Sequence, residues 1–151
     1  MPVVQTSNFG SISYNLDAAV EFPRGLPGFD NRRRFVALQF EDSAPLTFLQ
    51  SLEIPDLCFI TMPVLAVDPQ YRLKVSGEDL TELELSPTRQ PRIGEDVLCL
   101  TVLSFGEEGP TANLLAPVVV NVRNLRAVQA VAPDSGYSHQ HALLAEMAPV
   151  C

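Results

Sequence analysis

The residues with the greatest capacity for chemistry are two histidines and three cysteines, and their spacing limits what they can do. His139 and His141 would share one face of a strand, where two imidazoles can bind a metal, but no carboxylate or cysteine joins them in a short motif. Cys58 and Cys99 lie in apolar runs and are expected in the core, whereas Cys151 is terminal. We therefore expect no metal, no cofactor and no disulfide framework.

Other catalytic arrangements are also missing from the sequence. No serine lies in a G-x-S-x-G motif, and the stretch Gly25–Gly28 matches neither common phosphate-binding loop. The carboxylate pairs Glu53 with Asp56 and Glu107 with Glu108 are better interpreted as solvated turns than as acid–base pairs. We therefore expect that the chain is not an enzyme.

The charge balance favours a protein partner over a nucleic acid. Ten basic and 18 acidic residues give a net charge of −8, which repels phosphate backbones and attracts basic surfaces. The one basic run, Arg32–Arg34, has no second basic patch or interleaved aromatics and is interpreted as solvated. Acidic residues instead crowd one short stretch that could steer a basic partner. These residues are Glu78, Asp79, Glu82, Glu84, Glu95 and Asp96.

Length and composition predict a single domain over residues 1–151. Apolar residues make up 46% of the chain, enough for a globular core, and no apolar run reaches the ~18 residues that span a bilayer. The first residues carry neither a basic segment nor an apolar core, so they do not resemble a secretory signal. We expect a cytoplasmic monomer that contacts neither membrane nor nucleic acid.

Short apolar runs with alternating or β-branched character predict a mainly β protein. About eight to nine short strands, separated by turns every 8 to 12 residues, indicate a small closed or semi-closed β-barrel. The candidate strands are Val3–Thr6, Ser11–Tyr14, Ala18–Phe22, Phe35–Phe40, Thr47–Leu52, Leu57–Met62, Tyr71–Val75, Val97–Leu103, Leu114–Val122 and Ala127–Ala132.

One short helix and two special segments complete this prediction. Gly77–Leu85 is expected to be helical, because Ser76 can cap it and Leu80 and Leu83 share a face. Pro117 cannot donate to a ladder, so its strand should lie at a sheet edge or carry a bulge. The tail from about residue 137 is expected to be helical or loosely ordered.

Three motifs, in order along the chain, give a resemblance to a known family. They are Phe22–Phe29, then Phe48–Leu52 with Pro55–Ile60, then Thr111–Asn121 with its sequence TANLLAPVVVN. Together they resemble the FliW flagellar assembly factor family, and the similarity runs from about residue 3 to residue 132. The third motif is the most specific of the three.

The resemblance implies a small β-barrel-like fold, no enzymatic activity and two protein partners. One is newly made flagellin in the cytoplasm, and the other is CsrA, an RNA-binding regulator that blocks flagellin translation. Asn113 and Asn121 either tie loops to the barrel end or hold a binding edge, since buried amides need hydrogen-bond partners. The candidate partner-binding residues are Asn113, Leu114, Pro117, Asn121, Phe48, Gln50, Glu78, Asp79 and Glu82. The alternatives are a small-molecule-binding or enzymatic β-barrel and a structural subunit that works only as a homo-oligomer.

Overall fold

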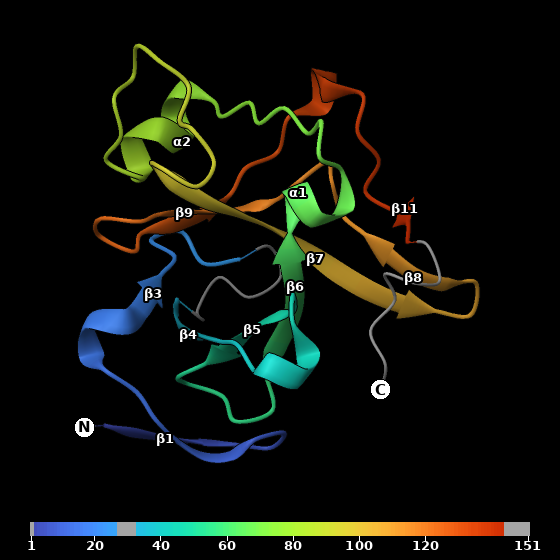
Figure 1. Cartoon of the computed structure of the whole chain (residues 1–151). Coiled ribbons are helices and arrows are strands. Elements are labelled where there is room, and N and C mark those ends of the chain that lie inside the picture. Colours follow the sequence, from blue (N-terminus) through green and yellow to red (C-terminus); the bar gives the residue numbers. More distant parts are fainter. Residues whose placement is uncertain (1, 27–32, 144–151) are drawn as a thin grey trace.

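Most of the chain forms one strongly curved antiparallel sheet, with a separate hairpin beside it (Figure 1). The computed structural model describes residues 2–26 and 33–143. The large sheet has the order β10-β9-β7-β6-β5-β4-β3, and β8 joins it on β7 and carries β11, while β1 and β2 form the hairpin. The strands are β1 (Val3–Thr6), β2 (Gly10–Ser13), β3 (Ala19–Glu21), β4 (Arg34–Leu38), β5 (Thr47–Ser51), β6 (Cys58–Pro63), β7 (Val97–Gly106), β8 (Gly109–Ala112), β9 (Val118–Asn121), β10 (Ala127–Gln129) and β11 (His141–Ala142).

Helices in the described residues are short and lie around the sheet (Figure 1). They are α1 (Val64–Val67), α2 (Gly77–Glu82) and the 3-10 turns η1 (Leu16–Ala18), η2 (Glu41–Ser43) and η3 (Pro133–Ser135). None of these described helices has the length and apolar character needed to cross a membrane.

The all-β class is confirmed, but the sheet does not close into a barrel within the described residues. Strands β3 and β10 stand at the two ends of the sheet order. The chain near them meets at an isolated bridge between Glu21 and Arg126, where the Glu21 backbone N–H donates to the Leu125 carbonyl at 3.0 Å. The curved sheet is therefore semi-closed. It has nine strands, and with the hairpin the described residues contain eleven strands, more than the eight to nine expected.

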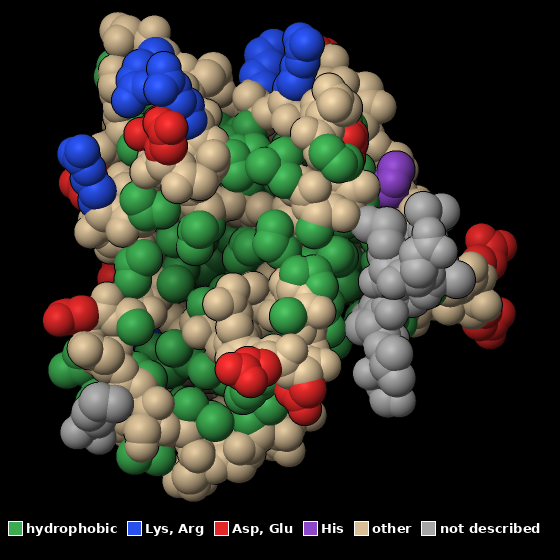
Figure 2. Space-filling model, in the orientation of Figure 1, with side chains coloured by type: hydrophobic (Ala, Val, Ile, Leu, Met, Phe, Trp, Pro, Cys, Tyr) green, Lys and Arg blue, Asp and Glu red, His purple; other side chains and the backbone are tan. Residues whose placement is uncertain are grey.

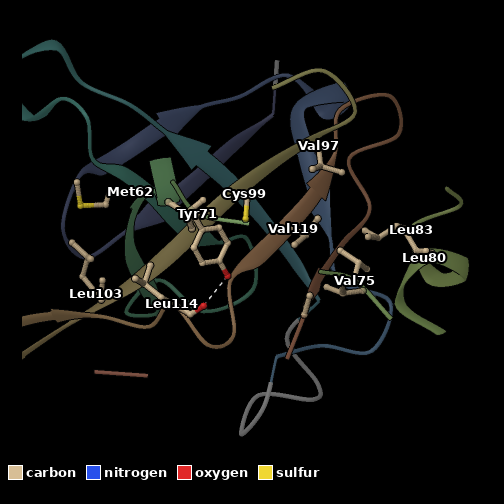
Figure 3. Close-up of a cluster of buried hydrophobic side chains, with 14 of the residues drawn as sticks. Met62, Tyr71, Val75, Leu80, Leu83, Val97, Cys99, Leu103, Leu114 and Val119 are labelled. Carbon is tan, nitrogen blue, oxygen red and sulfur yellow. Dashed lines mark hydrogen bonds between the residues drawn. The ribbon is translucent and has the colours of Figure 1, made fainter. Parts of the chain in front are cut away.

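Side chains of the central strands alternate between two buried clusters. On β7, Val97 and Cys99 pack in the larger cluster, whereas Leu100 belongs to the smaller one. Tyr71 also enters the larger cluster, where its hydroxyl donates to the Leu114 carbonyl at 2.7 Å (Figure 3). Because β7 is apolar on both faces, it reads as a continuous apolar run rather than an alternating one.

The predicted strand at Tyr71–Val75 is wrong. Its alternation of buried and exposed side chains is real, but these residues pair with no strand. The Gln90 amide replaces a neighbouring strand: its Oε1 accepts from the Val75 N–H at 2.7 Å and its Nε2 donates to the Val75 carbonyl at 2.9 Å. The Arg72 N–H likewise donates to the Tyr137 hydroxyl. Side chains thus satisfy backbone groups that a ladder would otherwise take.

The predicted helix is present but ends earlier, and a second helix was missed. Helix α2 starts after Ser76, whose hydroxyl accepts from the Asp79 N–H, as the capping pattern predicts. It ends at Glu82, because Glu84 adopts a φ of 60° that cannot continue a right-handed helix. Helix α1 follows β6 directly, and its four apolar residues lie outside every element expected from the sequence.

Two further expectations concern the C-terminal part of the chain, and the placing of the Pro117 strand at a sheet edge is wrong. Strand β9 begins after Pro117 and pairs with both β7 and β10, so it is not an edge strand. Pro117 stands just before the first residue of β9, so its missing N–H removes no bond from the ladder. Its carbonyl accepts from the Ala130 N–H. The tail is tied down at β11, where His141 pairs with Ala112 of β8, and Tyr137 stacks on Tyr71 with ring centroids 4.4 Å apart. Residues 144–151, including Cys151, lie outside the described residues.

Candidate partner-binding site

An apolar groove of about 400 Å³ opens at the mouth of the curved sheet. Figure 2 shows this hollow, with hydrophobic side chains gathered along its floor and walls. Most lining residues come from strands that the curvature brings together. They are Ala18, Val20, Ala37, Gln39, Thr47, Leu49, Pro63, Leu65, Ile93, Gly94, Leu98, Cys99, Leu100, Val120 and Leu125. The described lining is therefore apolar apart from a few side chains.

Two large aliphatic side chains of this groove remain exposed to solvent. Leu65 of α1 is 40% exposed and Leu98 of β7 is 45% exposed. Leu98 shares the groove face of β7 with Leu100, which is buried, because residues two apart point to the same side of a strand. Exposed apolar surface gathered in a concavity, rather than scattered singly, is typical of a binding site.

The acidic candidates on α2 are largely engaged with arginines of the same chain. Asp79 is buried and hydrogen-bonds to Arg24, which lies in the first family-like motif. That hydrogen bond is the main reason that the pKa of Arg24 is raised. Glu82 faces Arg126 at 3.5 Å, and the Arg126 Nε donates to the Glu82 carbonyl at 2.7 Å. Only Glu78 among these three candidates is exposed, and its nearest oxygen is 3.8 Å from Arg24.

The asparagine candidates serve as internal ties. Asn121 is 3% exposed: its Nδ2 donates to the Leu83 carbonyl at the end of α2 at 2.7 Å, and its Oδ1 accepts from the Arg123 N–H at 2.9 Å. Asn113 accepts the Ala116 N–H on its Oδ1 at 3.0 Å. Of the two roles open from the sequence, these bonds match the one in which both residues hold loops to the sheet.

The remaining candidates are split between the core and a second aromatic group. Leu114 is 1% exposed, and Pro117 is buried. Phe48 and Gln50 point to the side of β5 away from the groove residue Leu49. Gln50 is fully buried; its Nε2 donates to backbone carbonyls at 3.1 to 3.5 Å, and its Oε1 has no hydrogen-bond partner in the described residues.

Phe48 belongs to an aromatic group that joins the hairpin to the large sheet. Its ring centroid lies 5.2 Å from that of Phe9 and 5.9 Å from that of Phe40. The structure thus brings Asn121 together with α2, but it places Phe48 on another side of the sheet. The nine candidates do not form one surface.

The thiols and imidazoles of the described residues lie in different environments. Burial raises the pKa of Cys58 to about 11 and that of Cys99 to about 12, so both thiols keep their protons at neutral pH. His139 and His141 are exposed. Residues 2–26 and 33–143 contain no group of three or more potential metal-ligating side chains.

Comparison with known protein families matches residues 3–143 to the model described as FliW protein. The chain belongs to the FliW family. The resemblance drawn from the three motifs is thereby confirmed. Parts of the first motif, Pro27 to Phe29, and Arg32 lie outside the described residues, whereas the second and third motifs lie largely on β5, β6 and β9.

Relatives and a solved structure match almost the whole of this chain. A protein of Bacillus pumilus named flagellar assembly factor FliW is 32% identical over 149 residues, which is 99% of each chain. One of the same name from Desulfitobacterium hafniense strain Y51 is 32% identical over 95% of this chain and 91% of that protein. The crystal structure of the flagellar assembly factor FliW matches with a TM-score of 0.83 at 30% identity, covering 96% and 99%.

Sequence reasoning missed the groove. Its exposed leucines, Leu65 and Leu98, sit in apolar runs that read as ordinary core segments. The sequence of β7 did contain a sign of it, because successive residues on opposite sides of the strand are both apolar. A sheet that is apolar on both faces needs other protein surface packed against each face. Which part of that face stays uncovered depends on the curvature of the sheet, which the run itself does not encode.

Proposed function

We propose that this FliW-family chain is a non-catalytic flagellar assembly factor of the cytoplasm that binds flagellin in a chaperone-like manner and antagonises CsrA. The observation that carries the proposal is the match across residues 3–143 to a family whose relatives are named flagellar assembly factors. Binding rather than catalysis is supported by the groove, whose apolar lining offers a surface for another protein and few groups for chemistry.

The alternative of a small-molecule-binding or enzymatic barrel fits the groove less well. Its volume of about 400 Å³ is in the range of ligand pockets. However, such pockets fix their ligands with convergent polar groups, and the polar side chains in the described lining are Gln39, Thr47 and Cys99. The raised pKa of Cys99 comes from burial and makes this thiol less reactive, not more.

The layout of one loop supports the proposed antagonism between the two partners. Ile93 and Gly94 line the groove, and the next two residues, Glu95 and Asp96, belong to the acidic stretch. A partner in the groove and a basic partner on the acidic stretch would therefore meet at this loop. Linkage makes their interference reciprocal, and a coupling of ~1 to 3 kcal/mol changes each affinity ~5- to 150-fold.

The test is to titrate purified flagellin into a preformed complex of this chain with CsrA and to separate the species by size. We expect flagellin to displace CsrA. A stable ternary complex at saturating flagellin would refute mutual exclusion. A CsrA affinity unchanged between low and physiological salt, where the Debye length shortens to about 8 Å, would refute only the electrostatic part.

A further inference from the structure

The groove is large enough for several side chains of a partner, and its open state exposes apolar surface to water. A cavity of about 150 Å³ holds a molecule of the size of benzene, so one of about 400 Å³ has room for roughly two to three large apolar side chains. Leu65 and Leu98 stand on its walls with 40% and 45% of their surface exposed. Covering them would add hydrophobic stabilisation to a complex.

Acidic side chains next to the groove carry negative charge that is not neutralised within the described part of the chain. Asp17 directly precedes the lining residue Ala18, and Glu41 and Asp42 follow Gln39 after one residue. All three acids are exposed, and none forms a salt bridge among the described residues. Acidic side chains are visible beside the hollow in Figure 2. A partner in the groove would therefore gain from basic residues beside its apolar face.

The strands of the groove floor favour a helical occupant over an added strand. Strands β4, β5 and β9 of the lining are each paired on both sides, so their backbones offer no free edge to a guest strand. Strand β3 also lines the groove and stands at an end of the sheet, but it has three residues and its Glu21 N–H is already bonded to the Leu125 carbonyl. A helix needs no backbone partner and can insert side chains from positions i, i+3 or i+4 and i+7 into an apolar groove.

We propose that this groove receives the apolar face of an amphipathic helix of flagellin, with Lys or Arg residues beside that face meeting Asp17, Glu41 and Asp42. The inference rests on the proposed function, which supplies flagellin as the partner. A filament subunit kept unassembled leaves uncovered the apolar surfaces that its assembled form buries, and an apolar groove suits such a surface.

The first test places a charge in the groove. Leu98→Glu should weaken flagellin binding at least about 30-fold, the loss typical of a central interface residue, when affinity is measured by calorimetry. Val3→Glu is the matched control, because Val3 is 54% exposed but lies in β1, outside the groove lining. Its affinity should stay within about 2-fold of wild type. Circular dichroism and thermal melts establish that both variants fold, and Leu98→Ala gives a milder second probe of the same wall.

The second test reverses charge beside the groove. Glu41→Lys with Asp42→Lys should weaken binding roughly 3- to 10-fold at low salt, and the difference from wild type should shrink at high salt. Glu107→Lys with Glu108→Lys changes the net charge equally at the exposed turn between β7 and β8 and should have little effect. Equal losses of flagellin affinity in the two double variants would show that net charge, and not the position of Glu41 and Asp42 beside the groove, affects binding. That result would overturn this part of the proposal.

The outcomes separate the inference from the function on which it rests. If wild-type protein does not bind flagellin, the proposed function fails. If wild type binds and Leu98→Glu binds equally well, only the groove assignment fails. Hydrogen exchange on flagellin should protect one amphipathic helix flanked by Lys or Arg, and protection elsewhere would contradict the assigned occupant. A wild-type dimer that Leu98→Glu dissociates would instead make the groove a self-interface and overturn the proposal.

Discussion

Replacing Asn121 by alanine tests whether this residue is an internal tie or a partner contact. The substitution removes two hydrogen bonds, at 2.7 Å to the Leu83 carbonyl and at 2.9 Å from the Arg123 N–H. Each such bond contributes about 0.5–1.5 kcal/mol net, and a buried group left without its partner costs about 1–3 kcal/mol. The Asn124 amide, 3.5 Å from the same carbonyl, can compensate in part. We expect the free energy of unfolding to fall by about 2–3 kcal/mol.

The measurement is urea denaturation followed by circular dichroism, because the chain has no tryptophan for fluorescence. In a protein of this size the loss corresponds to a Tm lower by roughly 5–10 °C. Asn124→Ala is the control: it also removes two hydrogen bonds, from the Arg126 N–H and to Glu84, both at 2.9 Å, but this residue is exposed and water can replace them, so its loss should stay below about 1 kcal/mol. Equal stability losses in the two variants would refute the reasoning.

The same variant also decides the alternative left open by the sequence. At a temperature where it remains folded, Asn121→Ala should bind flagellin as wild type does, because the polar atoms of Asn121 already have partners within the chain. If flagellin affinity fell more than about 10-fold while stability was unchanged, Asn121 would contact the partner and the structural reading would be wrong.

Three further outcomes are expected. Burial raises the pKa of Cys99 to about 12 and that of Cys58 to about 11, so the folded chain holds these protons more tightly than the unfolded chain does. The two thiols should leave the free energy of unfolding unchanged below about pH 9 and lower it from there to about pH 12. In urea melts at stepped pH, Cys99→Ala should show a shallower fall. Asp79→Ala should lower the free energy of unfolding by about 1.5 kcal/mol, because it removes a buried, hydrogen-bonded partner of Arg24. Glu78→Ala should lower it by under about 0.5 kcal/mol, because its pair with Arg24, at 3.8 Å, is exposed. Similar losses in thermal melts would contradict the burial argument. EDTA or a reducing agent should leave the Tm within about 2 °C, and a larger fall would reveal a bound metal or a disulfide.

Local patterns predicted the strands well where backbone partners come from other strands, and failed where side chains supply them. The run at Val97 and the strand starting at Thr47 were found because β-branched and apolar residues suit a pleated buried surface. The segment at Val75 has the same alternation, but the Gln90 amide takes its backbone bonds. No local rule distinguishes these cases, since the deciding partner lies 15 residues away.

The candidate site was less predictable because it depends on long-range geometry. The acidic residues near α2 are visible in the sequence, but the pairing of Asp79 with Arg24 spans 55 positions. The exposure of Leu98 follows from how far the sheet curves over it, and no neighbouring residue signals this. Sequence therefore identified residue types and the family, whereas the structure showed which of these side chains are buried or paired within the chain and which are exposed.

Ion pairing also changes which negative charges a partner meets. The acidic stretch around α2 contains six carboxylates, but four arginines pair with them, which leaves an excess of two negative charges. Asp17, Glu41 and Asp42 near the groove form no such pairs among the described residues, so no salt bridge offsets their three charges there. Exposed charges without an internal partner have the most to gain from a basic one, and this gain is lost as salt screens it. The salt dependence of a partner's affinity therefore indicates where the partner binds. The affinity of a partner at the groove should have an apolar component that salt does not change. It should also have an electrostatic component that falls with salt more than binding at the acidic stretch around α2 would allow.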